Sequence, residues 1–571
     1  MRPLDWVVFF AWVLSLVSFG LYRGRGSNTV DKFLRAGKSM PWYAMGLSII
    51  ATQASAITFI STTGQGYVDG MRFVEFYFGL PIAMVILSAT AVPIFHRANV
   101  YTAYEYLERR FDAKTRALVG LIFLIQRGLA CGIGLYAPAV ALSDVLGWPD
   151  RLVTVVIGAL VVLYVTSGGI KGLTWADVQQ MAMIFVALIV SMVLMIQALP
   201  HSISLLDAVH LAGAAGRMNV VDTHLNWADR YNLWSGLIGG TFLALAYFGC
   251  DQSQVQRYLT GKSIAQSRLS LMLTAVVKIP MQLFILFIGV VVFALSLFIA
   301  PPMLFQPLVA KRAAQTAQWA PIHKQYDSAF AKRRQASYQL AAAARQGGAS
   351  LPPAVASFRH AEADFHQARL RALHLVSQMN GGSTYNDTNY IFLSFIRTYL
   401  PIGLLGLVVG VIFSASMGSS SGEINSLATV SMVDIYRRFF VRNGSDRHYL
   451  IASRCLTVFW GAYAVAFAAI GARGFGALIV RVNIVGSLFY GSLLGVFVLA
   501  FLFRGVGGNA AFWGVLVGEA GVLVVAASTQ VSFLWYNVVG CLLVVGVGLA
   551  LSRVRPGGKD AAQLDNRSGM R

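Results

Sequence analysis

Long apolar stretches alternate with short polar ones along most of the chain. Most are close to or above the roughly 20 residues that an α-helix needs to cross a hydrocarbon layer of about 30 Å. Because a bilayer offers no water to backbone groups, such stretches are expected to be helical. We predict thirteen transmembrane helices, near residues 4–22, 42–66, 73–96, 117–145, 152–168, 176–199, 232–256, 266–299, 399–431, 449–471, 476–503, 509–528 and 532–552.

One segment breaks this pattern. Residues 303–388 are rich in Ala, Gln, Arg and Lys, and two stretches of helix-forming composition, 307–345 and 354–378, flank the turn sequence QGGASLPP. Glycine and proline end helices at such turns, so we predict a helical hairpin outside the membrane. The hairpin is either a solvated insertion or a docking surface for an anionic lipid headgroup or a partner.

The composition also places the chain in lipid. Of 571 residues, 57% are hydrophobic and 12% are charged, which excludes an ordinary water-soluble globular protein. The formal net charge of +21 is of a size found in nucleic-acid-binding proteins, but the basic residues lie mostly in short connections rather than on one amphipathic face. We therefore expect a lipid bilayer, and not nucleic acid, around this chain. The sequence predicts no oligomeric state.

The basic residues predict an orientation, because Lys and Arg concentrate in cytoplasmic loops. The connections after odd-numbered apolar stretches carry Arg23, Arg25, Lys32, Arg35, Lys38, Arg97, Arg109, Arg110, Lys114, Lys262, Arg437, Arg438, Arg504, Arg553 and Arg555. With the first stretch running inward, the amino terminus lies outside and the carboxyl terminus inside. The hairpin then lies on the outer side, since long loops are translocated in spite of positive charge.

Three apolar stretches contain polar segments where ion ligands can gather. The second, IIATQASAITFISTTGQGY (49–67), and the seventh, LAYFGCDQSQVQRYL (245–259), are interrupted by polar residues and glycine, and 411–430, VIFSASMGSSSGEINSLATV, is a run of small hydroxyl residues and glycine. A cation that leaves water needs oxygen ligands, which hydroxyls and the carbonyls of an unwound helix supply without a buried charge. Matched interrupted helices are typical of inverted-repeat transporters. Helix packing through small residues is the alternative for the serine run.

Ionisable side chains inside apolar stretches are costly, so each is a candidate functional residue. Lys278 either contacts a solute or forms a structural ion pair. Arg127 either balances Asp251 or Glu75, or meets an anionic solute. Asp251 and Gln252, in the interrupted seventh stretch next to the expected solute pocket, and Glu75 are further candidates for contact with a solute.

Six motifs, in chain order, resemble the sodium:solute symporter family. They are SAITFISTTGQGY (55–67), YTAYEYLERRFD (101–112), GGIKGLTWADVQQ (168–180), GCDQSQVQRYLTGKS (249–263), NDTNYIFLSFIRTYLPIGLLGL (386–407) and IFSASMGSSSGEINSLATVSMVDIY (412–436). The family includes bacterial sodium/proline, sodium/galactose and sialic acid carriers, and animal glucose, iodide and multivitamin carriers. The likeness covers most of residues 1–505 and leaves the hairpin outside it.

The resemblance implies an all-α, polytopic fold with a LeuT-type core of two inverted five-helix repeats, built from the second to sixth and the seventh to eleventh helices. On this basis the chain divides into a leading helix (1–25), the first repeat with the start of the second (40–299), the hairpin insertion (303–388), the remainder of the second repeat (389–505), two trailing helices (506–555) and a cytoplasmic tail (556–571).

The resemblance also implies a main sodium site. The family forms it from two carbonyls of the first core helix and from a carbonyl and two hydroxyls of the eighth. Matched onto this chain, the ligands are the carbonyls of Ala51, Ala54 and Ala415 and the side chains at Gly418 and Ser419. Gly418 has no hydroxyl, so one ligand is absent, and Ser416 and Ser420 are the nearby candidates to replace it.

Some family members hold a second sodium ion with an aspartate of the fifth core helix and further hydroxyls of the eighth. Asp177 and Ser421 match two of these ligands, but Gly418 and Gly422 replace the others, so we expect a single coupling ion. Asp177 alternatively pairs with a lysine or arginine near the cytoplasmic side.

The same comparison bears on the solute. Lys278 resembles a lysine in the sugar pocket of the family's galactose carrier. Tyr77 and Thr58 are weaker candidates for the solute pocket. Thr58 stands where that carrier has a sugar-binding glutamine, and the loss of the glutamine argues against galactose.

We therefore predict a sodium-coupled secondary active symporter of a small polar or anionic organic solute, such as a sugar, sugar acid or carboxylate, working by alternating access in the plasma membrane, the inner membrane of a bacterium. The alternatives are a solute sensor on a transport fold and an uncoupled carrier or channel. A sensor would need a signalling domain, and the tail after residue 555 is short and polar. We expect no enzyme, because the chain has neither an HExxH motif nor paired intramembrane histidines.

Overall fold

The computed structural model describes residues 1–382, 385–470 and 478–554, and the regular elements within these ranges are helices. The membrane bundle contains α1 (Pro3–Arg23), α3 (Trp42–Gln53), α4 (Ala56–Val68), α5 (Leu80–Ala89), α6 (Ala91–Ala98), α8 (Ala113–Leu146), α9 (Asp150–Gln197), α11 (Gly240–Gly249), α12 (Gln252–Tyr258), α13 (Ile264–Ser296), α18 (Leu404–Val430), α19 (Asp446–Ile470), α20 (Leu478–Leu502), α21 (Gly508–Ser528) and α22 (Phe533–Val554). The remaining α-helices are α2 (Val30–Arg35), α7 (Ala103–Arg110), α10 (Leu205–Ala214), α14 (Pro307–Ala313), α15 (Trp319–Gln346), α16 (Leu351–Met379) and α17 (Ile391–Tyr399). Three further elements matter below: the 3₁₀ helix η2 (Gly70–Tyr77) and the π-helical η3 (Ser235–Gly239) and η6 (Ser431–Phe440).

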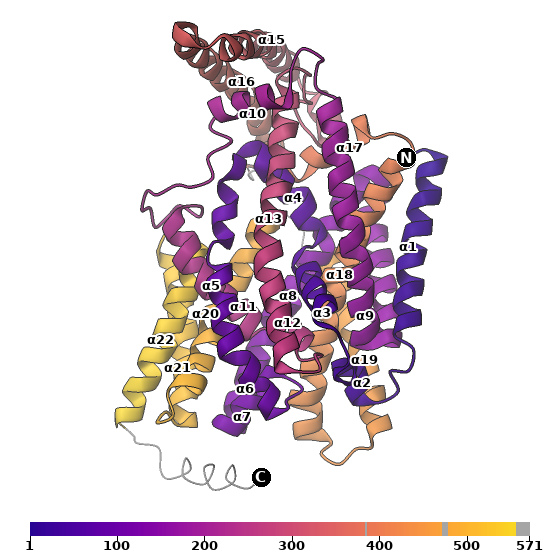
Figure 1. Cartoon of the computed structure of the whole chain (residues 1–571), viewed down its shortest axis with the longest axis vertical. Coiled ribbons are helices and arrows are strands. Elements are labelled where there is room, and N and C mark those ends of the chain that lie inside the picture. Colours follow the sequence, from indigo (N-terminus) through magenta and orange to yellow (C-terminus); the bar gives the residue numbers. More distant parts are fainter. Residues whose placement is uncertain (383–384, 471–477, 555–571) are drawn as a thin grey trace.

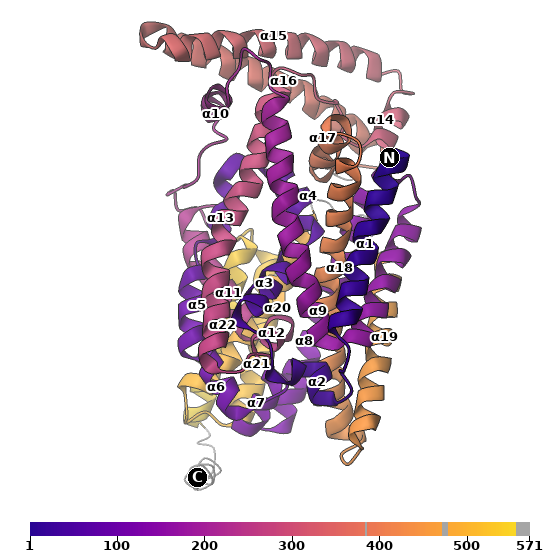
Figure 2. The ribbon, with the colours of Figure 1, turned by 45° about the vertical axis from the view of Figure 1, so that its right-hand side comes forward.

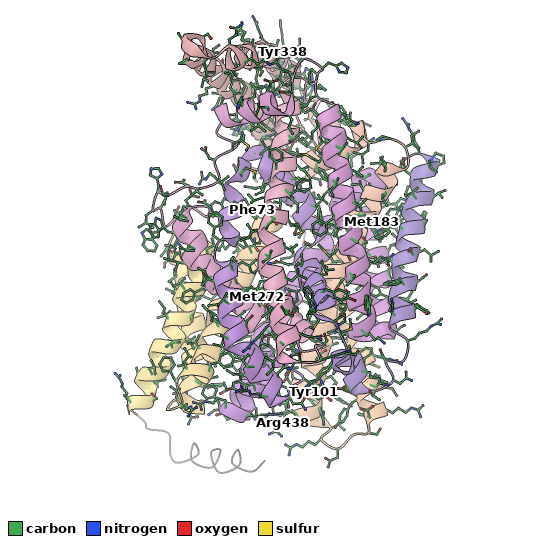
Figure 3. The ribbon with its side chains drawn as sticks, viewed as in Figure 1. Phe73, Tyr101, Met183, Met272, Tyr338 and Arg438 are labelled. Carbon is green, nitrogen blue, oxygen red and sulfur yellow. The ribbon has the colours of Figure 1, made fainter. Side chains whose placement is uncertain are left out.

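The two ends of the bundle differ. The pair α15 and α16 lies across one end, here called the hairpin end, and the amino terminus lies close to it (Figures 1 and 2). The helices α2, α6 and α7 and the last turn of α22 lie at the opposite end (Figure 1). Tyr338 of α15 and Arg438 of η6 mark the two ends in Figure 3.

Ten described helices are long and apolar enough to cross a membrane, or eleven if the bent pair α3 and α4 counts as one span. The chain is thus an all-α membrane protein, as predicted. The count is lower than the expected thirteen for two structural reasons. One long helix contains two expected spans, and another expected span is divided into short helices.

The long helix is α9, whose 48 residues would extend about 72 Å if straight, more than twice the hydrocarbon thickness. Gly169 has φ 56° and ψ −161°, so two helices meet there at a kink. Both ends of α9 lie near the hairpin end, because Trp148 stacks on Trp6 of α1 at 5.5 Å and α10, which follows α9, pairs with α15 through Asp207 and Arg345. The element therefore crosses the bundle twice, over the expected spans 152–168 and 176–199.

The divided span is the seventh. Its apolar part comprises η3 and α11, which ends at Gly249, and α12 begins at Gln252. Asp251 between them has φ −80° and ψ 119°, and its carboxylate accepts a hydrogen bond from the Ser253 amide at 2.9 Å, so it caps α12. The predicted interruption of this span is confirmed.

The second span is also interrupted. The axes of α3 and α4 differ by 62°. Between them Ala54 has φ −88° and ψ 65°, and Ser55 has φ −71° and ψ 171°, which are not helical values. In a continuous helix the Ser55 amide would bond the Ala51 carbonyl. Because Ser55 is extended, the last carbonyls of α3 are available to another partner.

The α15 and α16 hairpin has its own small core and is tied to the bundle. Phe365 of α16 packs against Tyr326 of α15 at 4.7 Å, and the Arg333 guanidinium lies 3.6 Å from the centre of the Phe365 ring. Arg345 at the end of α15 forms an ion pair with Asp207 of α10. This guanidinium holds the pKa of the Asp207 carboxyl well below its usual range, so the pair stays charged at any physiological pH.

Glycines permit the closest contact between α4 and α13. A Cβ at Gly66 would lie 2.3 Å from the Leu286 carbonyl oxygen, and a Cβ at Gly289 would lie 2.1 Å from the Thr63 carbonyl oxygen. Both neighbours are backbone atoms, which cannot rotate away as the end of a side chain can. Because Gly66 and Gly289 have no side chains, α4, which follows the break, packs closely against α13.

Gly66→Ala is expected to lower the free energy of unfolding by about 1–3 kcal/mol, because the added methyl group forces the two backbones apart. Thermal unfolding of the purified protein in detergent measures the change. Gly546→Ala in α22 is the matched control, since a Cβ there meets no atom within 4 Å. Equal melting temperatures for the two variants would contradict this packing.

Candidate functional site

A cavity lies where the break between α3 and α4 faces α8, α11, α18 and α20. Its polar lining consists of Thr52, Gln53, Ser55, Thr58, Tyr77, Gln126, Arg127, Tyr247, Ser419, Glu423, Asn483 and Tyr490. Apolar side chains such as Ile57, Phe76 and Phe248 complete the wall. A mostly apolar cavity with a few converging polar groups is the usual form of a small-molecule site.

The run of small residues lies in the middle of α18, directly against the break. A Cβ at Gly422 would lie 3.2 Å from the Thr52 methyl carbon and 3.4 Å from the Thr52 hydroxyl oxygen, and Ser419 lines the same cavity as Ser55. Ala415, Ser419 and Gly422 share one face of the helix, because they are four and three residues apart. The predicted meeting of the second span with this stretch is confirmed.

The expected sodium ligands on these helices are buried together. Ala51, Ala54 and Ala415 have no exposed surface, and Ser419 is 5% exposed. The Ser419 hydroxyl donates to the carbonyls of Ala415 at 3.3 Å and Ser416 at 3.2 Å, which leaves its oxygen lone pairs free to accept or ligate. Carbonyl and hydroxyl oxygens of this kind suit a hard monovalent cation.

Asp177 of α9 is paired with an arginine. Its Oδ2 accepts from the Arg257 Nη1 at 2.7 Å and from the Ser48 hydroxyl at 2.6 Å, and both charged side chains are at least 98% buried. Of the two expected roles for Asp177, ion pair and ligand of a second sodium ion, the structure shows the ion pair. Ser421, the other expected ligand, donates to the Gly418 carbonyl at 2.7 Å.

Arg127 of α8 joins three other segments. It forms ion pairs with Asp251, between α11 and α12, and with Glu423 of α18 at 2.9 Å, and it donates to the Tyr490 hydroxyl of α20 at 2.5 Å. Tyr490 in turn donates to Asp251 Oδ2 at 2.9 Å. Of the two expected counter-ions Asp251 is found, whereas Glu75 is not. Glu423, for which the sequence indicates no firm role, is the second counter-ion instead.

Lys278 of α13 is fully buried and its ammonium group has no hydrogen-bond partner among the described residues. The structural ion pair considered for it is therefore absent from this part of the chain. Its Nζ lies 5.4 Å from the ring centre of Tyr77, which lines the cavity. A cation over an aromatic face gains some stabilisation, but a buried ammonium group still favours a nearby anion.

The other expected solute contacts fall into two groups. Thr58 lines the cavity and donates to the Gln53 carbonyl at 3.2 Å, across the break. Glu75 accepts from the Asp222 amide at 2.7 Å, in the connection near the hairpin end. The Gln252 side chain accepts from the Ala103 amide and donates to the Tyr101 carbonyl, so it connects α12 to the start of α7. Glu75, Asp251, Gln252 and Lys278 are not among the cavity-lining residues.

Several lining residues were missed by the sequence reasoning. Gln53 and Gln126 are amides within apolar stretches, beside residues already singled out. Both Gln126 amide atoms are buried, and neither has a hydrogen-bond partner in the part of the chain that the structure describes. That polarity was a usable signal. Asn483 and Tyr490 of α20 offered no such signal in the sequence, because an isolated polar residue in a long apolar helix does not show which neighbours it faces.

The comparisons with known proteins match this architecture. A model of the sodium:solute symporter family covers residues 33–322 and 370–518. The chain belongs to the sodium:solute symporter family. The expected class, a sodium-coupled transporter and not an enzyme, is thereby confirmed.

Individual relatives span nearly the whole chain. It is 25% identical to the sodium/sialic acid symporter NanT of Aliivibrio fischeri over 99% of this chain and 96% of that protein, and 29% identical to sodium-coupled monocarboxylate transporter 1 of Xenopus laevis over 92% of this chain and 72% of that protein. A solved substrate-bound, outward-open Na⁺-coupled sialic acid symporter superimposes with a TM-score of 0.75 at 22% identity, covering 97% of this chain and 98% of that one. This match confirms the expected LeuT-type fold.

Arg257→Gln is expected to destabilise the protein by about 3–5 kcal/mol, because it leaves the Asp177 carboxylate buried without its counter-ion. Adding Asp177→Asn should restore most of this loss, since no charge is then unpaired. Thermal unfolding of the single and double variants in detergent measures both effects. Simple addition of the two single losses would show that the residues do not act as a pair.

Proposed function

We propose that this symporter couples sodium entry to the uptake of a small organic anion that carries a carboxylate. The observation that carries this proposal is the balance of buried charge around the cavity. Three basic side chains (Arg127, Lys278 and Arg257) and three acidic ones (Asp177, Asp251 and Glu423) are buried or nearly so, and their formal charges sum to zero. Glu75 is also buried, but it bonds the Asp222 amide toward the hairpin end and is not counted in this set.

A sodium ion added to this balanced set carries an unpaired charge in a medium of low dielectric constant. A monoanion bound in the adjoining cavity cancels it, so each ligand favours binding of the other. The two relatives described above transport sialic acid and monocarboxylates, according to their names, and both are organic acids. Arg127 in the cavity wall and the unpaired Lys278 beside Tyr77 are the groups that would attract the carboxylate.

The sodium ion would be held by the carbonyls of Ala51, Ala54 and Ala415 and the hydroxyl of Ser419. Two of these groups, the carbonyls of Ala51 and Ala54, belong to the broken helix, which can move relative to α18. An ion that bridges the segments stabilises the conformation in which they are close, and so shifts the equilibrium of the alternating-access cycle. Thr58, Tyr77 and Gln126 would contact the solute from the same wall.

A single coupling ion is proposed because the Arg257 guanidinium already fills the space beside Asp177 and Gly422, where a second sodium ion would bind. The Arg257 Nη2 lies 2.4 Å from where a Cβ of Gly422 would be, and Arg257 neutralises Asp177. Neither Gly418 nor Gly422 offers a hydroxyl. A second sodium ion next to Asp177, with Ser421 as a ligand, would have to displace the guanidinium.

We place the hairpin end outside and the opposite end in the cytoplasm, in the plasma membrane (for a bacterium, the inner membrane). The basic connections after α1 and α6 and the basic residues of α7 and η6 lie at the opposite end (Figure 1), as the positive-inside rule requires. The amino terminus is then outside and the carboxyl terminus inside. The 303–388 insertion is a periplasmic or extracellular cap.

The rival functions differ in what moves. A solute sensor binds its ligand without sodium-dependent uptake, and a channel passes ions without a fixed ratio to solute. Uptake of labelled sialic acid and short monocarboxylates by proteoliposomes, with sodium or choline outside, separates the three functions. Equal uptake in sodium and choline would refute symport.

Ser419→Ala is expected to raise the half-saturating sodium concentration for uptake about tenfold or more, because it removes a ligand oxygen. Ser426→Ala is the matched control: this serine is equally buried in α18, but its hydroxyl bonds the Glu423 carbonyl and does not line the cavity. Both variants should reach the membrane in similar amounts. An unchanged sodium dependence in Ser419→Ala would reject the site assignment.

One sodium ion and one monoanion together carry no net charge. Accumulation should therefore follow the sodium gradient alone, about 1.4 kcal/mol for each tenfold difference. A membrane potential, worth about 2.3 kcal/mol per charge at 100 mV, should add nothing. Imposing an inside-negative potassium diffusion potential with valinomycin tests this. A clear rise in steady-state accumulation would instead require a second ion or an uncharged solute.

A further inference from the structure

The gap that Gly418 leaves in the proposed sodium site is occupied by a side chain from another helix. A Cβ at Gly418 would lie 2.4 Å from the Oε1 of Gln180, 2.9 Å from its Nε2 and 3.0 Å from its Cδ. The Gln180 amide therefore fills the space that a serine side chain would take at position 418. Gln180 lies on α9, three residues after Asp177, so both side chains face α18 from one side of α9.

Gln180 is not held there by the protein. Its side chain is 1% exposed, and its Nε2 has no hydrogen-bond partner among the described residues. The unpartnered Nε2 is a donor and needs water or another acceptor, whereas Oε1, to which no described group donates a hydrogen bond, is the atom available to a cation. The amide is aimed at the face of α18 that carries Ala415 and Ser419.

The serines considered as replacements for the absent hydroxyl are badly placed. Ser416 and Ser420 each lie two residues from Gly418, which puts them roughly 160° around the helix from it. Their hydroxyls are buried on that other side and have no hydrogen-bond partners within residues 1–382, 385–470 and 478–554. Neither can reach an ion held between the break and the Gly418 face.

We propose that the Oε1 of Gln180 is a sodium ligand of this transporter and supplies the oxygen that Gly418 lacks. The inference rests on the sodium site proposed above and adds a third helix to it. An amide oxygen is a good ligand for a hard cation and, like a hydroxyl, brings no charge. The buried charge balance is therefore the same as with a serine ligand.

The arrangement also explains why position 418 is a glycine in this chain. A side chain there would displace the Gln180 amide from its present position, so the glycine and the glutamine form a matched pair. Replacing Gln180 by Ala and Gly418 by Ser together should keep one ligand oxygen at this place, whereas replacing Gln180 alone should remove it.

Sodium binding to the purified protein without solute tests this pair. The readout is the sodium concentration at half-maximal thermal stabilisation, in choline chloride of constant ionic strength. Gln180→Met keeps the length of the side chain without its oxygen and should raise this concentration about tenfold or more. The double variant Gln180→Ala with Gly418→Ser should return it to within about threefold of the unaltered protein, since 1.4 kcal/mol separates each tenfold step.

Gln179→Ala is the matched control. Gln179 is the preceding residue on α9, but its Nε2 donates to the Ser15 hydroxyl of α1 at 3.1 Å, away from the site. Its sodium concentration at half-maximal effect should not change. The melting temperature without sodium shows for each variant whether it folds.

The outcomes separate the two proposals. If the unaltered protein is not stabilised by sodium, the sodium site itself is refuted. If it is stabilised, and Gln180→Met responds at the same sodium concentration, only the role of Gln180 is overturned. Should Gln180→Met fail to fold, the double variant decides: wild-type-like sodium binding supports the exchange, and a folded double variant with tenfold weaker binding overturns it.

Discussion

The cost of leaving a backbone carbonyl without a partner inside a membrane governs this structure. A continuous second span would satisfy every carbonyl and bind nothing. The break at Ala54 and Ser55 gives up that satisfaction, and it is tolerated because α13, α18 and the cavity enclose it within protein. The close contacts at Gly66 and Gly289 hold α4 against α13 on the hairpin side of the break (Figure 1). In the proposed sodium site a bare cation would offset the lost hydrogen bonds, so the defect that weakens the helix would also supply the ligands.

Charge balance extends this constraint from the ion to the solute. Almost every buried charge near the cavity is paired: Asp177 with Arg257, and Arg127 with Asp251 and Glu423. Since two acids share one arginine, the Arg127 group has a formal negative excess, which Lys278 on the far side of Tyr77 offsets without touching it. An arginine already bound to two carboxylates is not free to hold a third, so a solute carboxylate must compete with Glu423 for it or approach Lys278. The pairing thus makes Glu423, which lies on α18 one turn from Ser419, a link between ion and solute.

The sequence was most informative where polarity contradicts its surroundings. The interruptions at 49–67 and 245–259 and the small-residue run at 411–430 were visible because each breaks an apolar pattern, and all three lie at the centre of the structure. Which residues meet across the bundle was not visible. Arg127 could be listed with Asp251 and Glu75 as possible partners, but only the packing of α8 against α18 selects Glu423. Likewise, the sequence shows that position 418 lacks a hydroxyl. Only the fold shows that Gln180, more than 200 positions earlier in the chain, lies next to it.

The exchange between Gly418 and Gln180 has a consequence for coupling. A serine ligand would belong to α18, so the ion would bridge only the broken helix and α18. A glutamine ligand belongs to α9, whose second half also carries Asp177. Asp177 in turn pairs with Arg257 of α12, at the end of the interrupted seventh span. Sodium would then hold together α3, α18 and α9, and through Arg257 also α12. Because an ion shifts an equilibrium only by its difference in affinity between two states, a ligand on an additional helix makes occupancy depend on the position of that helix too. The coupling would be tighter, although the number of ligand oxygens is the same.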